Sequence, residues 1–274
     1  YIKVGNLMFL SNLMIRLEHA AMNEPTTVNK GWTVTLAGTS INLILGVLYA
    51  WGVVKKVLVD PTGQWKWTDA QGTLPFTLST ISFSIMMIFA GRMQDKMGPK
   101  KTAMLGGLML GGGMILSSFA HSPATMALTF GLVVGMGVGL GYSATTPPAL
   151  KWFPPAKKGL IAGIVVSGIG LAAVLMGPVS ATLMGKFGVQ KMFLILGVAS
   201  IVIITVLAQL LNDPPAGYVP AAPAPAAGKP AAAAAQRNMD WNEMIKTSQF
   251  WRLWLTMTLT AAAGLMMIVH IPRI

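Results

Sequence analysis

The side chains in this sequence that could carry out chemistry are few, and none of them forms a recognisable catalytic set. The 274 residues include no Cys, which excludes disulfides and thiolate chemistry. We find no paired carboxylates, no nucleophile with a base and no glycine-rich phosphate loop. His121 and His270 have no partner at metal-ligating spacing. We therefore expect no enzyme, no catalytic residue, no cofactor and no metal site.

Four polar side chains inside long uncharged stretches are candidates for binding a ligand. Tyr49 in "GVLYAW" and Tyr142 in "GLGYSA" can each donate a hydrogen bond to a carboxylate while the ring packs against apolar neighbours. Asn42 and Thr80 are weaker candidates, because small polar side chains in apolar helices usually bond to their own backbone or to a neighbour. Since polar groups in the middle of a membrane helix tend to be functional, we predict that these four contact a substrate. The competing interpretation is that packing satisfies each of them.

A dense charged stretch, "GRMQDKMGPKK" at residues 91–101, separates two apolar runs. Its glycines allow positive φ and a tight reversal between helices, and its proline ends one conformation and starts the next. Its carboxylate can accept hydrogen bonds from a helix N-terminus and pair with a cation. We predict a cytoplasmic loop, called the charged motif loop, formed by Gly91, Arg92, Asp95, Lys96, Gly98, Lys100 and Lys101.

The composition places these residues in a membrane protein. Hydrophobic residues make up 54% of the chain and charged residues 10%, with a mean hydropathy of +0.63. A soluble domain usually carries about 25% charged residues. The net charge of +12 comes mostly from Lys and Arg in short breaks between apolar runs. That placement suits topology signals and anionic lipid headgroups, so we expect the lipid bilayer as a partner and no nucleic acid.

Uncharged stretches long enough to cross the hydrocarbon recur along the chain. A crossing needs about 20 mostly apolar residues. The uncharged stretch 102–150 is too long for one crossing, and "HSP" at 121–123 supplies a turn within it. The sequence predicts an all-α integral membrane bundle with seven transmembrane helices near residues 32–54, 70–91, 102–120, 124–150, 159–185, 192–212 and 253–269.

The distribution of Lys and Arg predicts the orientation of this bundle. The breaks after the second, fourth and sixth predicted helices are richer in Lys and Arg than the alternate breaks. Cytoplasmic loops carry such an excess. We therefore place these breaks and the N-terminus in the cytoplasm of a multi-pass protein of the cell membrane. Trp65 and Trp67 then lie in the first outer loop, either at the membrane interface or packed within the loop.

Composition shifts divide the chain into four parts. Residues 1–31 form an N-terminal cytoplasmic segment, of which residues 1–21 look non-native. Residues 32–212 form a six-helix unit. Residues 213–248 are a Pro/Ala-rich cytoplasmic linker, because such a composition buries little apolar surface. Residues 249–274 contain the seventh helix, after which the chain stops abruptly.

The charged motif loop, lying between the second and third helices, resembles the signature loop of the major facilitator superfamily, which implies that it acts as a conformational latch. The stretches "FTLSTISFS" and "GMGVGLGYSATTPPALKWFPPAKKGLIAGIVVSGIGLA" are similar to the oxalate/formate antiporter family within it, which includes proton-linked monocarboxylate carriers. The likeness covers about residues 22–270. That family has twelve helices in two six-helix halves. The resemblance therefore implies a fragment that holds the first half and the seventh helix.

The resemblance implies a secondary active transporter of small organic anions that works by alternating access. Its substrate would be a monocarboxylate or dicarboxylate such as lactate, formate or oxalate, moved by antiport or by symport with protons, and the full-length protein would be a monomer. The first and fourth helices would line the cavity, where the family has tyrosines at the positions of Tyr49 and Tyr142. Thr80 and Leu48 stand where oxalate-specific members carry Gln, which favours a smaller or more apolar monocarboxylate.

Two other interpretations stay open on the sequence. A carrier of the same fold could move neutral or cationic compounds, as in drug efflux, and the chain could be a fragment that does not transport. The first six predicted helices contain no charge that would offset a buried carboxylate. An intramembrane Arg or Lys beyond residue 274 would favour an anion carrier, and an Asp or Glu would favour the other substrates.

Small residues and one proline of the fourth and fifth helices predict close packing and bending. Gly135 and Gly139 are expected to bring two helices close together. Gly177 and Pro178 are expected to kink the fifth helix or to break it. Gly131 stands where many members of the superfamily carry Arg, so no proton-coupling role is assigned to this position.

Overall fold

The computed structural model describes residues 30–215, 217–220 and 241–270, and this part of the chain is helical without strands. The predicted N-terminal segment up to residue 29 and the part of the predicted linker from 221 to 240 lie outside the described residues. The elements in chain order are α2 (Gly31–Leu45), the 3-10 segment η1 (Gly46–Ala50), α3 (Trp51–Leu58), α4 (Asp69–Met97), α5 (Pro99–Ser117), α6 (Pro123–Met126), the π-helical segment η2 (Ala127–Val134), α7 (Gly135–Lys151), α8 (Pro155–Ala208), α9 (Trp241–Met244) and α10 (Ser248–His270).

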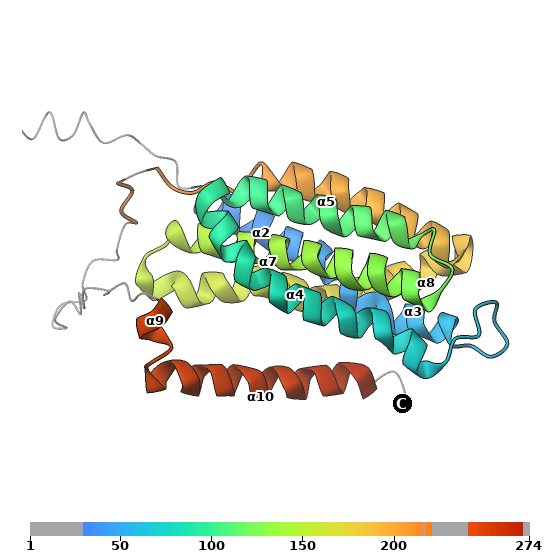
Figure 1. Ribbon diagram of the computed structural model, residues 1–274. Helices are drawn as coiled ribbons and strands as arrows, with labels where there is room; N and C mark the ends of the chain where they lie inside the picture. The colour runs from blue at the N-terminus through green and yellow to red at the C-terminus, as the bar shows by residue number, and fades with distance from the viewer. Residues whose placement is uncertain (1–29, 216, 221–240, 271–274) are drawn as a thin grey trace, which may run out of the picture.

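The helices from α2 to α8 run along one long axis and pack into a bundle (Figure 1). Within the described residues, four helical stretches are long and apolar enough to cross a membrane: Gly31–Leu58, Asp69–Met97, Pro123–Lys151 and Pro155–Ala208. The last has 54 residues and covers both the fifth and the sixth predicted helices. α5 corresponds to the third predicted helix and α10 to the seventh. The predicted all-α membrane bundle is confirmed.

The first crossing changes its winding near its middle. Its α-helical turns tighten to a 3-10 helix over Gly46–Ala50 and resume at Trp51. There Gly46 lies against α8, where a Cβ would collide with the side chain of Ala172 and come within 3.1 Å of the Ile169 carbonyl. The missing side chain lets the two helices touch at the segment that carries Tyr49.

The charged motif loop is a helix end followed by a sharp reversal. α4 continues to Met97, the chain turns at Gly98 with φ 81° and ψ 165°, and Pro99 begins α5. This region of backbone torsion is essentially restricted to glycine. The prediction that Gly91 also supplies a positive φ is wrong. Gly91 lies inside α4, because the helix continues past residue 91, where the span was predicted to end.

α8 contains a second reversal of the same kind. Its torsions are helical except at Gly188, which has φ 81° and ψ 167°. The predicted break at Gly177 and Pro178 does not occur, because within α8 only Gly188 departs from helical torsions. A Cβ on Gly177 would meet only the Val53 side chain, at 4.0 Å.

The fourth crossing, from α6 through η2 to α7, packs against α4 through glycines. Its π-helical part is of a kind often found at functional sites. Ser82 of α4 donates its hydroxyl to the Gly131 carbonyl at 2.7 Å. A Cβ on Gly135 would collide with the Ser82 hydroxyl, and one on Gly139 would lie 2.8 Å from the Phe83 carbonyl. Both glycines that were predicted to pack therefore face α4.

α5 is held on both sides by contacts between main chains. On one side, a Cβ on Gly106 would lie 2.8 Å from the Gly137 carbonyl of α7. On the other, a Cβ on Gly197 would lie 2.7 Å from the Gly111 carbonyl. Such close approach is how small residues stabilise helix pairs in a bilayer, where the hydrophobic effect between helices is absent.

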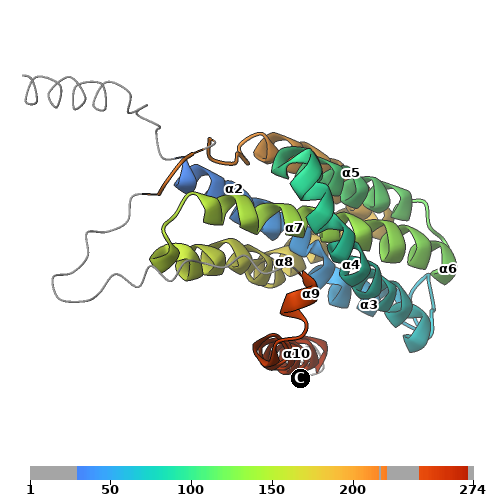
Figure 2. The same cartoon turned by 60° about the vertical axis from the view of Figure 1, so that its left-hand side comes forward.

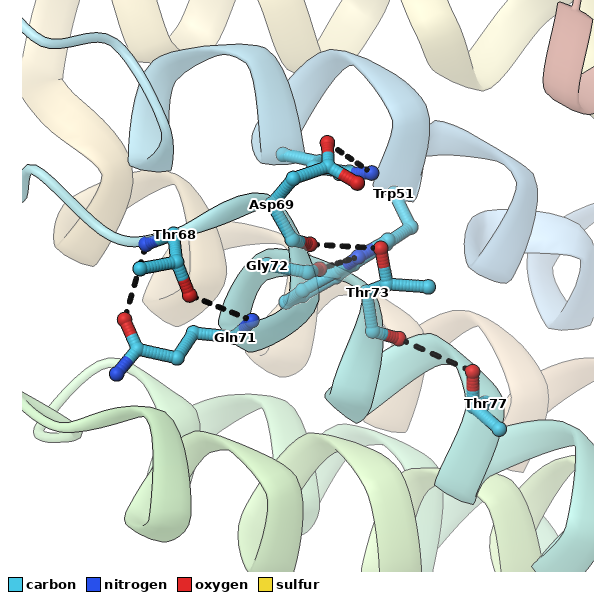
Figure 3. A network of polar contacts seen from close by, with 8 residues as sticks. Trp51, Thr68, Asp69, Gln71, Gly72, Thr73 and Thr77 are labelled. Atoms are coloured by element: carbon cyan, nitrogen blue, oxygen red, sulfur yellow. Dashed lines mark hydrogen bonds and ion pairs between the residues drawn. The ribbon is translucent and has the colours of Figure 1, made fainter.

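Polar contacts close the end of the bundle that carries the α3–α4 loop (Figure 3). Thr68 and Gln71 form a capping box at the start of α4, each side chain bonding to the other's backbone N–H. Trp51 donates its indole N–H to the Gly72 carbonyl at 2.9 Å. These bonds fix the entry of the chain into α4.

The two tryptophans of the α3–α4 loop pack within the protein. Trp67 is 7% exposed, and its backbone N–H donates to the Leu58 carbonyl at 2.9 Å. Trp65 lies edge-on to Trp67 and stacks on His121, which follows α5, with ring centroids 6.3 Å apart. Their contacts therefore agree with the interpretation that the two tryptophans pack against neighbouring residues.

α10 stands apart from the bundle in two views (Figures 1 and 2). Its side chains from Trp251 to Gly264 are exposed. Its apolar surface is therefore not buried by the other described helices, unlike the inner faces of α2, α5 and α7.

Candidate functional site

Tyr49 and Tyr142 lie on two neighbouring crossings, in η1 and in α7. Both side chains are half-buried. The ring of Tyr142 packs edge-on against Phe83 of α4, with centroids 5.9 Å apart. Neither hydroxyl has a hydrogen-bond partner among the described residues. Two unpaired, partly accessible O–H groups are thus available to donate to a ligand.

Asn42 is fully buried and joins three helices. Its Nδ2 donates to the Val165 carbonyl of α8 at 2.8 Å. Its Oδ1 accepts from Thr145 Oγ1 of α7 at 3.1 Å. Both ends of the amide are engaged within the protein, so this geometry fits a residue that positions helices better than one that touches a substrate.

Thr145 connects Asn42 to the turn that carries Tyr142. Its Oγ1 lies 2.9 Å from the Tyr142 carbonyl as well as 3.1 Å from Asn42 Oδ1, so one hydroxyl proton serves both acceptors. Thr145 was missed by sequence reasoning. Residues three apart share a helix face, so a polar residue three positions after Tyr142 was the available signal.

Thr80 bonds within its own helix. Its Oγ1 donates to the Thr77 carbonyl at 2.8 Å and to the Phe76 carbonyl at 3.1 Å. Its side chain is half-buried, and it lies three residues before Phe83, the contact of Tyr142. The structure therefore places Thr80 on the helix beside the tyrosine pair with its donor already in use.

The charged motif loop lies apart from these polar side chains, around the reversal at Gly98. The Asp95 carboxylate is exposed and makes no hydrogen bond or ion pair with another described residue. The same part of the chain offers no salt bridge to the basic side chains of the loop, Arg92, Lys96, Lys100 and Lys101. The hydrogen bonds and ion pairs among the described residues therefore give no indication of what this loop does.

The predicted membrane helices that carry Tyr49 and Tyr142 offer hydrogen-bond donors but no charged side chains. The sequence stretches predicted as helices one to six contain no Asp, Glu, Lys or Arg. No group of three or more His, Cys, Asp or Glu that could hold a metal ion occurs in the part of the chain that the structure describes. What the arrangement can do is bind a polar or anionic group by hydrogen bonds.

Apolar crossings, glycine-packed helices and two half-buried tyrosines on adjacent crossings indicate a multi-pass membrane protein. Residues 31–274 match the family described as the Major Facilitator Superfamily. The match covers most of the chain, so the chain belongs to this family. The expected relationship is confirmed, including the similarity to oxalate/formate antiporters.

Three relatives show how the chain compares with longer proteins. The uncharacterized MFS-type transporter YhjX of Escherichia coli is 26% identical over 245 residues, covering 89% of this chain and 58% of that protein. The oxalate:formate antiporter of Oxalobacter formigenes is 27% identical over 257 residues, covering 91% and 58%. Monocarboxylate transporter 12 of Homo sapiens is 40% identical over 94 residues, covering 34% and 18%. The chain spans less than two thirds of the length of each.

Proposed function

We propose that this chain forms the first half of a secondary active transporter of small organic anions. The observation that carries the proposal is the pair of half-buried hydroxyls of Tyr49 and Tyr142, which have no hydrogen-bond partner among the described residues. The relatives named as an oxalate:formate antiporter and a monocarboxylate transporter support an anionic substrate.

Each tyrosine hydroxyl would donate a hydrogen bond to a carboxylate oxygen. The described wall has no cation, so the charge that offsets the desolvation of the anion would come from the second half of the transporter. Leu48 is apolar and buried, and the Thr80 hydroxyl is already bonded within its own helix. Both residues would therefore keep the polarity of the substrate site low. This favours a monocarboxylate over oxalate, moved by antiport or by symport with protons.

Asn42 and the charged motif loop would serve the movement of the transporter. Asn42 would position the crossings that carry Tyr49 and Tyr142 through its bonds to Val165 and Thr145. Asp95, unpaired within the described residues, would engage the second half and hold one state of the alternating-access cycle.

Transport measurements on the full-length protein test the proposal. Uptake of labelled formate, lactate and oxalate into proteoliposomes would be compared for the parent, Tyr142→Phe and Tyr49→Phe. Loss of a hydrogen bond to a charged group costs about 1.5–3 kcal/mol, so KM should rise about tenfold or more. Tyr218→Phe, outside the crossings, is the matched control. Unchanged KM values in both tyrosine variants, or uptake of neutral or cationic compounds alone, would contradict an anion carrier.

The 274-residue chain alone should not transport, because it spans 58% of the length of the first relatives and would provide one wall of the cavity. Proteoliposomes that contain only this chain should show no saturable uptake. Saturable uptake of lactate or oxalate by these vesicles would show that the second half is dispensable.

A further inference from the structure

The chain that leaves α8 returns to the end of α7. Trp152, the first residue after α7, donates its indole N–H to the Asn212 carbonyl at 2.8 Å. Next to it, Lys151 Nζ lies 2.9 Å from Asp213 Oδ1. Two consecutive residues of one segment thus bind two consecutive residues of the other. These contacts fall where the Pro/Ala-rich linker was predicted to begin.

A turn then brings Tyr218 back onto the same tryptophan. The Tyr218 backbone N–H donates to the Pro215 carbonyl at 3.0 Å, and Gly217 has φ 84°, the positive value that a type II turn needs at its third residue. The rings of Trp152 and Tyr218 are 5.1 Å apart, and the Tyr218 hydroxyl donates to the Trp152 carbonyl at 3.4 Å. These contacts hold Tyr218 in a fixed position against Trp152.

Burial marks where this docked segment ends. Leu211 is 0% exposed and Trp152 is 3% exposed, whereas Val219 is 83% exposed. The neighbouring Phe153 packs edge-on against Trp32 of α2, with ring centroids 5.5 Å apart. The contact thus joins α2, the end of α7 and the chain after α8 at one end of the bundle.

We propose that Lys151, Trp152 and Tyr218 fasten the start of the predicted linker to the bundle, so that the docked part of the chain extends past Asn212 to Tyr218. We call residues 211–215, 217 and 218 the linker stem. Seven extended residues reach about 24 Å, and docking removes that reach from the predicted linker. Because the effective concentration of linked units depends on tether length, the stem limits how far the following helix can move from this half. This inference does not depend on which solute is transported.

Distance measurements by electron paramagnetic resonance on the whole chain test the proposal, because the sequence contains no Cys that would compete for spin labels. Labels on Lys157→Cys and Val219→Cys report the stem, and labels on Lys157→Cys and Lys101→Cys report the bundle. Both pairs should give narrow distributions in the parent chain. Trp152→Ala should broaden the first distribution to about 15 Å, the r.m.s. reach of a flexible seven-residue segment, and leave the second unchanged.

Two further variants separate loss of docking from loss of fold. Tyr218→Phe keeps the ring and removes only the hydroxyl contact, so the first distribution should stay narrow. Gly217→Val places a branched side chain on a positive φ, while a Cβ there meets no atom within 4 Å, so it should open the turn without disturbing the bundle. If Trp152→Ala alters the distance distributions of both label pairs, the distribution of the first pair in Gly217→Val is the deciding measurement. A broad first distribution in the parent, or one that stays narrow in Gly217→Val, overturns the proposal.

Discussion

The reversals at Gly98 and Gly188 share their backbone geometry but differ in their surroundings. Gly98 has φ 81° and ψ 165°, and Gly188 has φ 81° and ψ 167°. The first lies among the charged residues of the 91–101 stretch, whereas the second lies between Lys186 and Lys191. A Cβ on either glycine would meet no atom within 4 Å. The reversal therefore requires only the backbone freedom of glycine, and the charges around Gly98 must serve another purpose.

The two reversals lie at opposite ends of the bundle. Gly98 directly precedes α5, whereas Gln190, two residues after Gly188, bonds at 3.3 Å to His121, which follows α5. A helix of the 19 residues of α5 is about 28 Å long, close to the thickness of the hydrocarbon core. The two ends of the bundle thus share the backbone geometry of the reversal, but only the end at Gly98 has the excess of basic residues.

The largest expected difference between the reversals is the side of the membrane from which each can be reached. The chain has no Cys, so Met97→Cys and Phe187→Cys, which replace residues 40% and 50% exposed, each carry one thiol. In intact cells an impermeant maleimide should label the cysteine at 187 and should label the one at 97 only after permeabilisation. Labelling of both from the same side would refute the assigned topology.

Alanine at either reversal should destabilise the protein by a similar amount. Gly98→Ala and Gly188→Ala each place a side chain in a torsion region that costs about 1–3 kcal/mol for residues other than glycine. Unfolding in detergent, followed by circular dichroism, should show both losses. A loss in only one variant would mean that equal torsions do not impose equal strain.

Helical glycines near each reversal should respond with the opposite sign. Gly91 and Gly185 have helical torsions, and a Cβ on either would meet no atom within 4 Å. Gly91→Ala and Gly185→Ala should therefore stabilise the chain by about 0.4–1 kcal/mol, through the lower entropy of the unfolded state. Destabilisation of either variant in the same unfolding assay would place that glycine outside a regular helix.

The smallest effect is expected for the carboxylate of the motif loop. Asp95 makes no hydrogen bond or ion pair with another described residue, so Asp95→Asn should change the stability of this chain by no more than about 0.5 kcal/mol. The same variant in the full-length transporter should alter the exchange rate if the loop engages the second half. A larger loss of stability in the 274-residue chain would reveal a partner within this half.

Local signals in the sequence located most of the fold. Apolar length and flanking charge placed the start of α4 within one residue, and the predicted ends at residues 185 and 192 bracket Gly188. The sequence did not show that the chain reverses at Gly188 rather than at Gly185, since Gly185 ends the predicted helix and Gly188 lies in the short break after it. Nor did it show the 3-10 and π-helical windings, which depend on how closely neighbouring helices approach.

The candidate site was predicted as separate residues and not as a connected unit. Tyr49 and Tyr142 could be chosen because they are the two tyrosines inside the predicted membrane helices. That Asn42 bonds to Val165 and Thr145 could not be foreseen, because contacts across helices depend on the rotation of each helix about its axis. The glycine contacts between α5 and its neighbours set this rotation, and they are long-range.

The amide of Asn42 has a mechanical consequence for the whole half. Sliding of α8 along α2 must break the buried bond between Asn42 and Val165, and sliding of α7 along α2 must break the one between Asn42 and Thr145, each at a cost of about 1–3 kcal/mol. Joint movement is the path of lower energy. The three helices are then expected to move as one rigid unit, with any relative movement at the outer boundary of this unit rather than between its helices.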